Sequence, residues 1–226
     1  MAAVVAVGTI VVGCGSGKQP DGEPSAPAKA APPAQEKLAA DPGIRYEKAV
    51  VPAMEGLVCD EGDGGFRFGQ GLDISVSGDD GLKEVADEAD DHADEISCSG
   101  SPRITLREGT ASASVPDFTA RTNLYDKVAD PTASLDEIFE QSMSLSKSYG
   151  RDLIGEPRAF TSRTLVVKCG HNTADTLPMT TCFWANYGAA GVVDFFPPQG
   201  QHVPMESAAA LTKNFVAGAL KGTSGS

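Results

Sequence analysis

The sequence lacks the short motifs that mark common catalytic and metal sites. It contains no His-Glu-x-x-His, no Gly-x-Ser-x-Gly and no Cys-x-x-Cys, and its three histidines, His92, His171 and His202, are far apart. Zinc hydrolases, serine hydrolases and thiol redox sites need those spacings, because they bring the reacting groups together locally. The sequence therefore favours a protein that is not an enzyme, and it predicts no metal ion and no cofactor.

Basic residues are scarce as well. The chain has 18 Lys and Arg against 31 Asp and Glu, which gives a formal net charge of −13. Nucleic-acid binding relies on clustered Lys and Arg, so nucleic acid is excluded as a partner. The same deficit argues against direct adhesion to anionic lipid headgroups, whereas the acidity suits a soluble domain.

No apolar run is long enough for a membrane span, which needs about 20 residues. The N-terminal run, residues 1–13, has the length of a secretory h-region, although no Lys or Arg precedes it. It ends in Val11-Val12-Gly13-Cys14, which resembles the bacterial lipobox. The resemblance implies that residues 1–14 are a signal sequence with a lipobox, cleaved before Cys14, and that Cys14 carries the lipid. The alternative is an uncleaved membrane anchor that begins upstream of Met1, and both place the rest of the chain outside the cytoplasm.

The segment after Cys14 has the composition of a tether. Residues 15–43 are rich in Pro, Ala and Gly and show no apolar periodicity. Such a segment cannot bury enough surface to offset the entropy of ordering it, and proline pairs favour extended spacing. We therefore expect a flexible tether over 15–43 and a single extracytoplasmic domain over 44–222, anchored to the outer face of the cell membrane.

Periodicity within 44–222 predicts an α+β domain: an antiparallel sheet with helices packed on one face, ending in a three-stranded meander and a C-terminal helix. A capping box, Ser134 to Glu137, marks the start of the middle helix, and Gly150 marks its end. In chain order the expected elements are strands over 66–76, a helix over 79–95, strands over 103–106 and near 119, a helix up to 150, three strands over 159–196, and a last helix from 204 to 220.

The helix expected over 79–95 is the most acidic part of the chain. It carries nine carboxylates and one lysine, and its apolar residues form only a thin stripe. Four of them, Asp87, Asp90, Asp91 and Asp94, are candidates for a weak divalent-cation site. No Asp-x-Asp-x-Asp-Gly calcium loop occurs there, so a solvated helix face is the favoured interpretation.

With Cys14 assigned to the lipid, four of the five cysteines remain in the folded part. An even number of cysteines in an exported domain points to disulfides. Cys169 and Cys182 flank a turn between adjacent expected strands, and pairing them leaves Cys59 with Cys98. Metal binding and free or differently paired thiols are the alternatives. If Cys169 faces Cys182, then Val167 faces Trp184 and Leu165 faces Asn186. Because alternate side chains of a strand share one face, Trp184 would lie on the same face as the disulfide and pack beside it.

The second half resembles a group of uncharacterised actinobacterial lipoproteins and membrane-anchored secreted proteins, over roughly residues 123–220. Those proteins share a helix after Asp-Pro, a strand with one Cys, and a strand of the form Cys-x-Trp-Ala-Asp. The matching stretches here are Asp130-Pro131, Leu135-Asp136-x-x-Phe139, Lys168-Cys169-Gly170 and Cys182-Phe183-Trp184-Ala185. Asn186 stands where the pattern has an acidic residue. The resemblance implies a Cys169–Cys182 bridge and a surface location, but no activity.

Together these features predict a lipid-anchored extracytoplasmic protein with a non-catalytic binding or envelope-associated domain. Its partners would be the membrane, through the anchor, and a protein or small molecule that the sequence does not identify. A small-ligand or cation carrier that uses the acidic 79–95 segment is the alternative. A hydrolase with an unfamiliar site, built around His171 or His202, is a third hypothesis.

Overall fold

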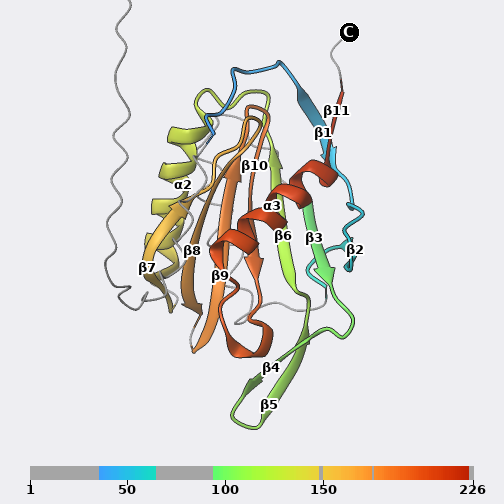
Figure 1. The fold of residues 1–226 in the computed structure, drawn as a ribbon, viewed down its shortest axis with the longest axis vertical. Coiled ribbons are helices and arrows are strands. Elements are labelled where there is room, and N and C mark those ends of the chain that lie inside the picture. The colour runs from blue at the N-terminus through green and yellow to red at the C-terminus, as the bar shows by residue number, and fades with distance from the viewer. Residues whose placement is uncertain (1–35, 65–93, 148–149, 175, 224–226) are drawn as a thin grey trace, which may run out of the picture. The chain divides into compact units, whose positions relative to one another are not determined.

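The computed structural model describes residues 36–64, 94–147, 150–174 and 176–223 (Figure 1). Its elements are β1 Arg45–Ala49, β2 Val58–Glu61, β3 Asp94–Ser99, β4 Ile104–Glu108, β5 Ala111–Val115, β6 Phe118–Leu124, α2 Pro131–Lys147, β7 Arg151–Ala159, β8 Val166–Ala174, β9 Leu177–Ala185, β10 Ala189–Phe195, the short 3-10 helix η2 Pro198–Gly200, α3 Met205–Ala219 and β11 Leu220–Thr223.

Seven strands form one antiparallel sheet in the order β2-β3-β6-β10-β9-β8-β7. The predicted α+β class is therefore confirmed in outline, and so is the meander, which is β8-β9-β10. The strands expected over 103–106 and near 119 are β4 and β6. The strand expected over 66–76 lies outside the described residues.

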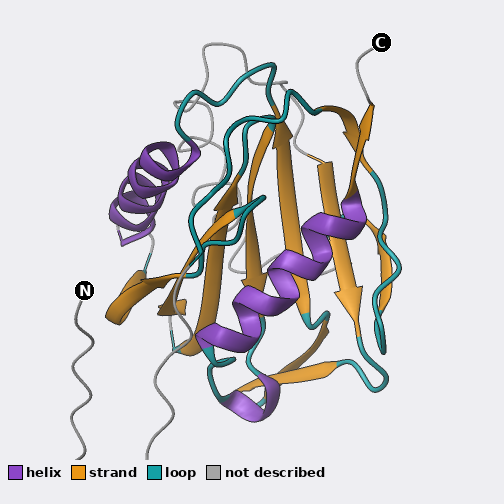
Figure 2. Ribbon diagram, turned by 45° about the horizontal axis from the view of Figure 1, so that its top comes forward, coloured by secondary structure: helices purple, strands orange, loops and turns teal. Residues whose placement is uncertain are grey.

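The two helices of the described residues pack on opposite faces of the sheet, so the prediction of a single helical face is wrong. Val167 and Trp184 share a core cluster with Phe215 of α3. Their chain neighbours, Val166 and Phe183, share another cluster with α2. Consecutive strand residues point to opposite faces, which places α3 over one face and α2 over the other. Figures 1 and 2 show α3 running diagonally across the near side of the strands, with α2 away from that side.

The middle helix begins three residues earlier than the predicted capping box. Asp130 is its N-cap: one carboxylate oxygen accepts the backbone N–H groups of Thr132 at 3.0 Å and Ala133 at 3.1 Å. Ser134 lies inside the first turns, and its own N–H donates to the Asp130 carbonyl at 2.9 Å. Pro131 occupies the first helical position, where its missing N–H costs nothing.

The last helix follows the prediction closely. Pro204 directly precedes α3, and the expected apolar stripe is buried, including Ala208, Thr212 and Phe215. The chain then continues as β11, which pairs with β1 instead of stopping at Lys221 and Gly222. Within the part of the chain that the structure describes, neither helix is long and apolar enough to cross a membrane.

The end of the expected tether lies against the domain. Ala39 donates its N–H to the Arg163 carbonyl at 2.9 Å, and the Tyr187 hydroxyl donates to the Ala39 carbonyl at 3.0 Å. Leu38 packs against the cluster beneath α2. The chain is thus hydrogen-bonded to the β7–β8 and β9–β10 loops several residues before Ile44, and this segment forms one wall of the candidate site.

Candidate functional site

Both predicted disulfides are present: Cys59–Cys98 joins β2 to β3, and Cys169–Cys182 joins β8 to β9. Val167 faces Trp184 as predicted, but the ladder ends at Val166–Ala185, so Leu165 and Asn186 are not a strand pair. Trp184 has no exposed surface and is a packing residue. Two disulfides indicate folding in an oxidising, extracytoplasmic environment.

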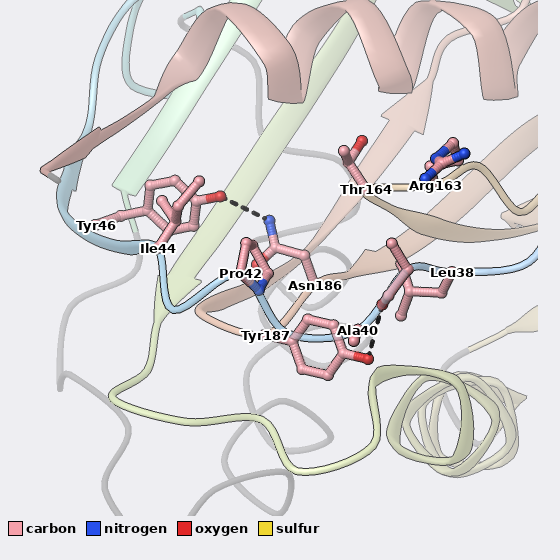
Figure 3. Close-up of a pocket in the computed structure, with 10 residues that line it drawn as sticks. Leu38, Ala40, Pro42, Ile44, Tyr46, Arg163, Thr164, Asn186 and Tyr187 are labelled. Carbon is pink, nitrogen blue, oxygen red and sulfur yellow. Dashed lines mark hydrogen bonds between the residues drawn. The ribbon is translucent and has the colours of Figure 1, made fainter.

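A small hollow lies where the 38–46 segment crosses the end of the sheet (Figure 3). Its volume is about 190 Å³, somewhat more than a cavity of about 150 Å³ that takes up benzene. Most of the lining is apolar, with a few polar groups at its edge. The lining residues are Leu38, Ala39, Ala40, Pro42, Ile44, Tyr46, Arg163, Thr164, Asn186 and Tyr187.

Asn186 is fixed in the turn between β9 and β10. Its side-chain oxygen accepts the N–H groups of Gly188 at 2.9 Å and Ala189 at 2.8 Å, so both of its lone pairs are occupied. Its amide nitrogen donates to the Tyr46 hydroxyl at 3.2 Å. Figure 3 shows this nitrogen and the phenol oxygen pointing toward each other. The turn therefore orients a hydrogen-bond donor toward the hollow.

Tyr46 brings its phenol to the same point from β1. Partial burial raises the pKa of the Tyr46 phenol, an effect that its hydrogen bond with Asn186 and the charge of Arg45 oppose. The phenol thus stays protonated at neutral pH. Because its oxygen accepts from Asn186, its own hydrogen points elsewhere, and no acceptor for it is found among the described residues.

A second hollow, of about 200 Å³, lies on the other side of Tyr46, toward α3. Tyr46, Thr164 and Asn186 line both hollows, so the two are neighbours. Lys213 lines the second hollow, together with Ser162, Leu165, Val216, Ala217 and Leu220. Burial lowers the Lys213 pKa, and the charge of Glu36 opposes that shift.

The charged side chains that line the two hollows are both basic. Arg163 lines the first hollow and Lys213 the second, and neither lining includes Asp or Glu. Asp41, beside the first hollow, is held by Arg45 in an ion pair of 2.9 Å. In a chain with a net charge of −13, two linings with one basic side chain each and no acidic one are unusual.

A wider groove of about 660 Å³ lies between the β4-β5 hairpin and η2. Its polar side chains include Arg103, which donates to the Gly64 carbonyl at 2.8 Å, and Asp117, which accepts the N–H of Gly100. These two side chains already have backbone partners. The groove is therefore a weaker candidate than the hollows at Tyr46.

The predicted cation site is only partly within the described residues. Asp87, Asp90 and Asp91 lie outside them. Asp94, with Glu95, belongs to β3, so the predicted helix is wrong at its C-terminal end. The Asp94 carboxylate accepts the Ala49 N–H at 2.8 Å, which gives it a structural role. Among the described residues, no group of three or more His, Cys, Asp and Glu is arranged to hold a metal ion.

Two of the histidines meet in space although 31 positions separate them in the chain. The rings of His171 and His202 stack with centroids 4.5 Å apart. His171 Nε2 lies 3.1 Å from the Val203 carbonyl oxygen, and His202 Nε2 lies 3.0 Å from that of Asn172. Each ring therefore donates to a backbone carbonyl, and the pair ties β8 to the segment before α3.

The sequence pattern missed the residues that form the hollows. Tyr46, Lys213 and Asn186 come from three distant segments, and none belongs to a catalytic or binding motif. The only hint in the sequence was Asn186, which stands where the Cys-x-Trp-Ala-Asp pattern of the resembled proteins has an acidic residue. Comparison with known proteins adds nothing here: no family model, curated protein or solved structure matches the chain.

Proposed function

We propose that this protein is a lipid-anchored extracytoplasmic domain that binds a small molecule, without catalysis, in the hollow at Tyr46 and Asn186. The observation that carries the proposal is an apolar hollow large enough for a ring-sized group, with hydrogen-bond donors at its edge that have no acceptor among the described residues. Ligand sites in proteins combine a mostly apolar lining with a few placed polar groups.

The anchor is part of the same proposal. It is supported by the lipobox-like Val11-Val12-Gly13-Cys14 and by the two disulfides, which fit a location outside the cytoplasm. The membrane is then a partner through the lipid on Cys14. Residues 38–46 connect that tether to the domain and also line the hollow.

Metabolic labelling tests the anchor. Cells that express the full chain are grown with a palmitate analogue, beside Cys14→Ser and the control Ser16→Ala. We expect label and membrane association for the wild type and for Ser16→Ala, and release of unlabelled protein from Cys14→Ser. Labelled Cys14→Ser protein would refute lipid attachment at this residue.

Ligand-observed NMR with octanamide tests the hollow, because this probe is neutral and has a short apolar chain. The full chain carrying Cys14→Ser is used, so that no attached lipid competes. Ala40→Trp places a large ring in the lining, whereas Ala210→Trp places one on the exposed side of α3. We expect saturation transfer to octanamide from the parent and Ala210→Trp, but not from Ala40→Trp. Transfer that is absent from the parent, or unchanged in Ala40→Trp, would refute binding in this hollow.

A further inference from the structure

We infer that the ligand is an anionic amphiphile: a carboxylate that sits between Lys213 and Tyr46, with a short apolar chain directed toward Leu38 and Ile44. This inference rests on the proposed function, since it assigns a chemical class to the ligand of the same site. Three observations on the described residues support it: hydrogen-bond donors without acceptors, a lysine without an ion-pair partner, and a neighbouring apolar hollow.

Tyr46 and Asn186 line both hollows, and each has a hydrogen-bond donor with no acceptor among the described residues. Asn186 has used both oxygen lone pairs on Gly188 and Ala189, and its amide donates one hydrogen to Tyr46. The second amide hydrogen and the Tyr46 hydroxyl hydrogen have no acceptor among the described residues. A carboxylate accepts several hydrogen bonds and donates none, so it complements this arrangement.

Lys213 supplies the positive charge. Its side chain is only partly exposed, and within the described part of the chain its ammonium group has neither an ion pair nor a hydrogen bond. Glu36 is the carboxylate whose charge acts on it, but the two form no ion pair within 4 Å. Removing an ammonium group from water without a partner is unfavourable, and a bound anion would relieve that cost.

The first hollow would hold the apolar end of the ligand. Leu38, Pro42 and Ile44 line it, and 42 % of the Ile44 surface is exposed to solvent. Covering this side chain would remove apolar surface from water, which stabilises a complex by about 25 cal/mol per Å². The two volumes, about 190 and 200 Å³, suit a medium-length chain rather than a whole lipid.

Calorimetry with three probes separates the contributions, using the full chain with Cys14→Ser. Octanoate has both the charge and the chain, octanamide has the chain alone, and acetate has the charge alone. We expect octanoate to bind at least tenfold more tightly than octanamide, and acetate to give no measurable heat. Equal affinity for octanoate and octanamide would overturn the anion assignment while leaving the proposed hollow intact. Binding of neither would overturn both.

Lys213→Met tests the cation, with Lys147→Met, at the exposed end of α2, as the matched control. Methionine keeps most of the apolar length of lysine and is a good helix former, so α3 should be preserved. We expect octanoate binding to weaken at least tenfold in Lys213→Met only, with octanamide binding unchanged in both. An unchanged octanoate affinity in Lys213→Met would refute the role of Lys213.

Asn186→Asp is the second variant. A carboxylate can still accept the N–H groups of Gly188 and Ala189, so the turn should form, but it would also take the Tyr46 hydroxyl hydrogen and repel an anion. We expect octanoate binding to fall at least tenfold while octanamide binding persists. Retained octanoate binding, in protein shown to be folded by the fluorescence of the single tryptophan, would contradict the inference.

Discussion

Gly191 lies against Trp184 in the middle of the sheet, and the contact leaves no room for a side chain. A Cβ atom at Gly191 would lie 2.7 Å from Cζ2 of the indole ring and would also clash with the Arg121 carbonyl oxygen. One of these two groups is a backbone atom and the other is a fully buried ring, so neither can move aside easily. Glycine is required here by close approach, not by an unusual backbone conformation.

We expect Gly191→Ala to lower the free energy of unfolding by about 1–3 kcal/mol, the usual range for overpacking. Urea unfolding followed by Trp184 fluorescence measures it directly. Gly100→Ala is the control, because the nearest atom to its Cβ would be a side-chain oxygen of Asp117 at 3.2 Å, which can shift. A loss as small in Gly191→Ala as in the control would show that the strands separate to accept the methyl group.

The environment of His171 predicts that the stability of the domain depends on pH. Burial lowers the pKa of His171, and the neighbouring His202 lowers it further, whereas the Val203 carbonyl and Glu206 raise it. Glu206 is itself paired with Arg158. A histidine pKa below its unfolded value of about 6.5 means that the unfolded chain binds the proton first as the pH falls. Its contribution is therefore present above about pH 6.5 and is lost as the pH falls toward the folded pKa.

We expect His171→Gln to reduce the loss of unfolding free energy between pH 7.5 and pH 5.5, because glutamine does not titrate. Urea denaturation of the wild type and the variant at both pH values measures this loss in each protein. The same carboxylates titrate in both proteins, so their contribution largely cancels when the two losses are subtracted. An identical pH dependence in the two proteins would assign the effect to other groups.

At the residue level, the sequence pattern was informative about packing and much less so about binding. Cys169, Cys182 and Trp184 could be placed because period two fixes which strand residues face each other. Tyr46 and Lys213 could not, because 167 positions separate them in the sequence and no local pattern relates them. Their proximity depends on how α3 and β1 cross the end of the sheet.

Among the elements, β7 is one of several strands that the sequence pattern did not predict. It forms one edge of the sheet, most of its residues are exposed, and it contains Gly155 and Pro157 at a shift in register. An edge strand has little apolar alternation, and proline is tolerated there. By contrast, β8, β9 and β10 have adjacent apolar pairs such as Val192-Val193, a pattern of burial on both faces. That pattern was the available sign that α2 and α3 cover different faces.

The start of α2 gives a prediction at the element level. Asp130→Ala removes the carboxylate that accepts two backbone N–H groups, so we expect a loss of about 1 kcal/mol in unfolding free energy. Ser134→Ala should have a smaller effect, since Ser134 is inside the helix. Thermal or urea denaturation of the two variants decides whether Asp130 or Ser134 caps the helix. A larger loss in Ser134→Ala would support the predicted capping box instead.

For the molecule as a whole, the two disulfides differ in accessibility. Cys169, Cys182 and Cys98 have no exposed surface, whereas Cys59 is partly exposed on the edge strand β2. We expect a reductant to open Cys59–Cys98 in the folded protein, while Cys169–Cys182 reacts only when the whole domain unfolds. Timed alkylation and peptide mass analysis, on the chain with Cys14→Ser, would follow each pair. Reduction of both pairs at one rate without unfolding would contradict this order.

The pairing of β1 with β11 brings together the first and last strands of the described residues, with Arg45 opposite Thr223. Neighbouring antiparallel strands can be joined by a two-residue turn, so a short linker from Thr223 to Arg45 would close the strands and helices into a ring, at the cost of residues 36–44 and the wall of the hollow that they form. The ring could then be opened at Gly109, in the exposed turn between β4 and β5. We expect such a circular permutant to fold with the same two disulfides, because the order in which the elements are joined would change while their neighbours would not.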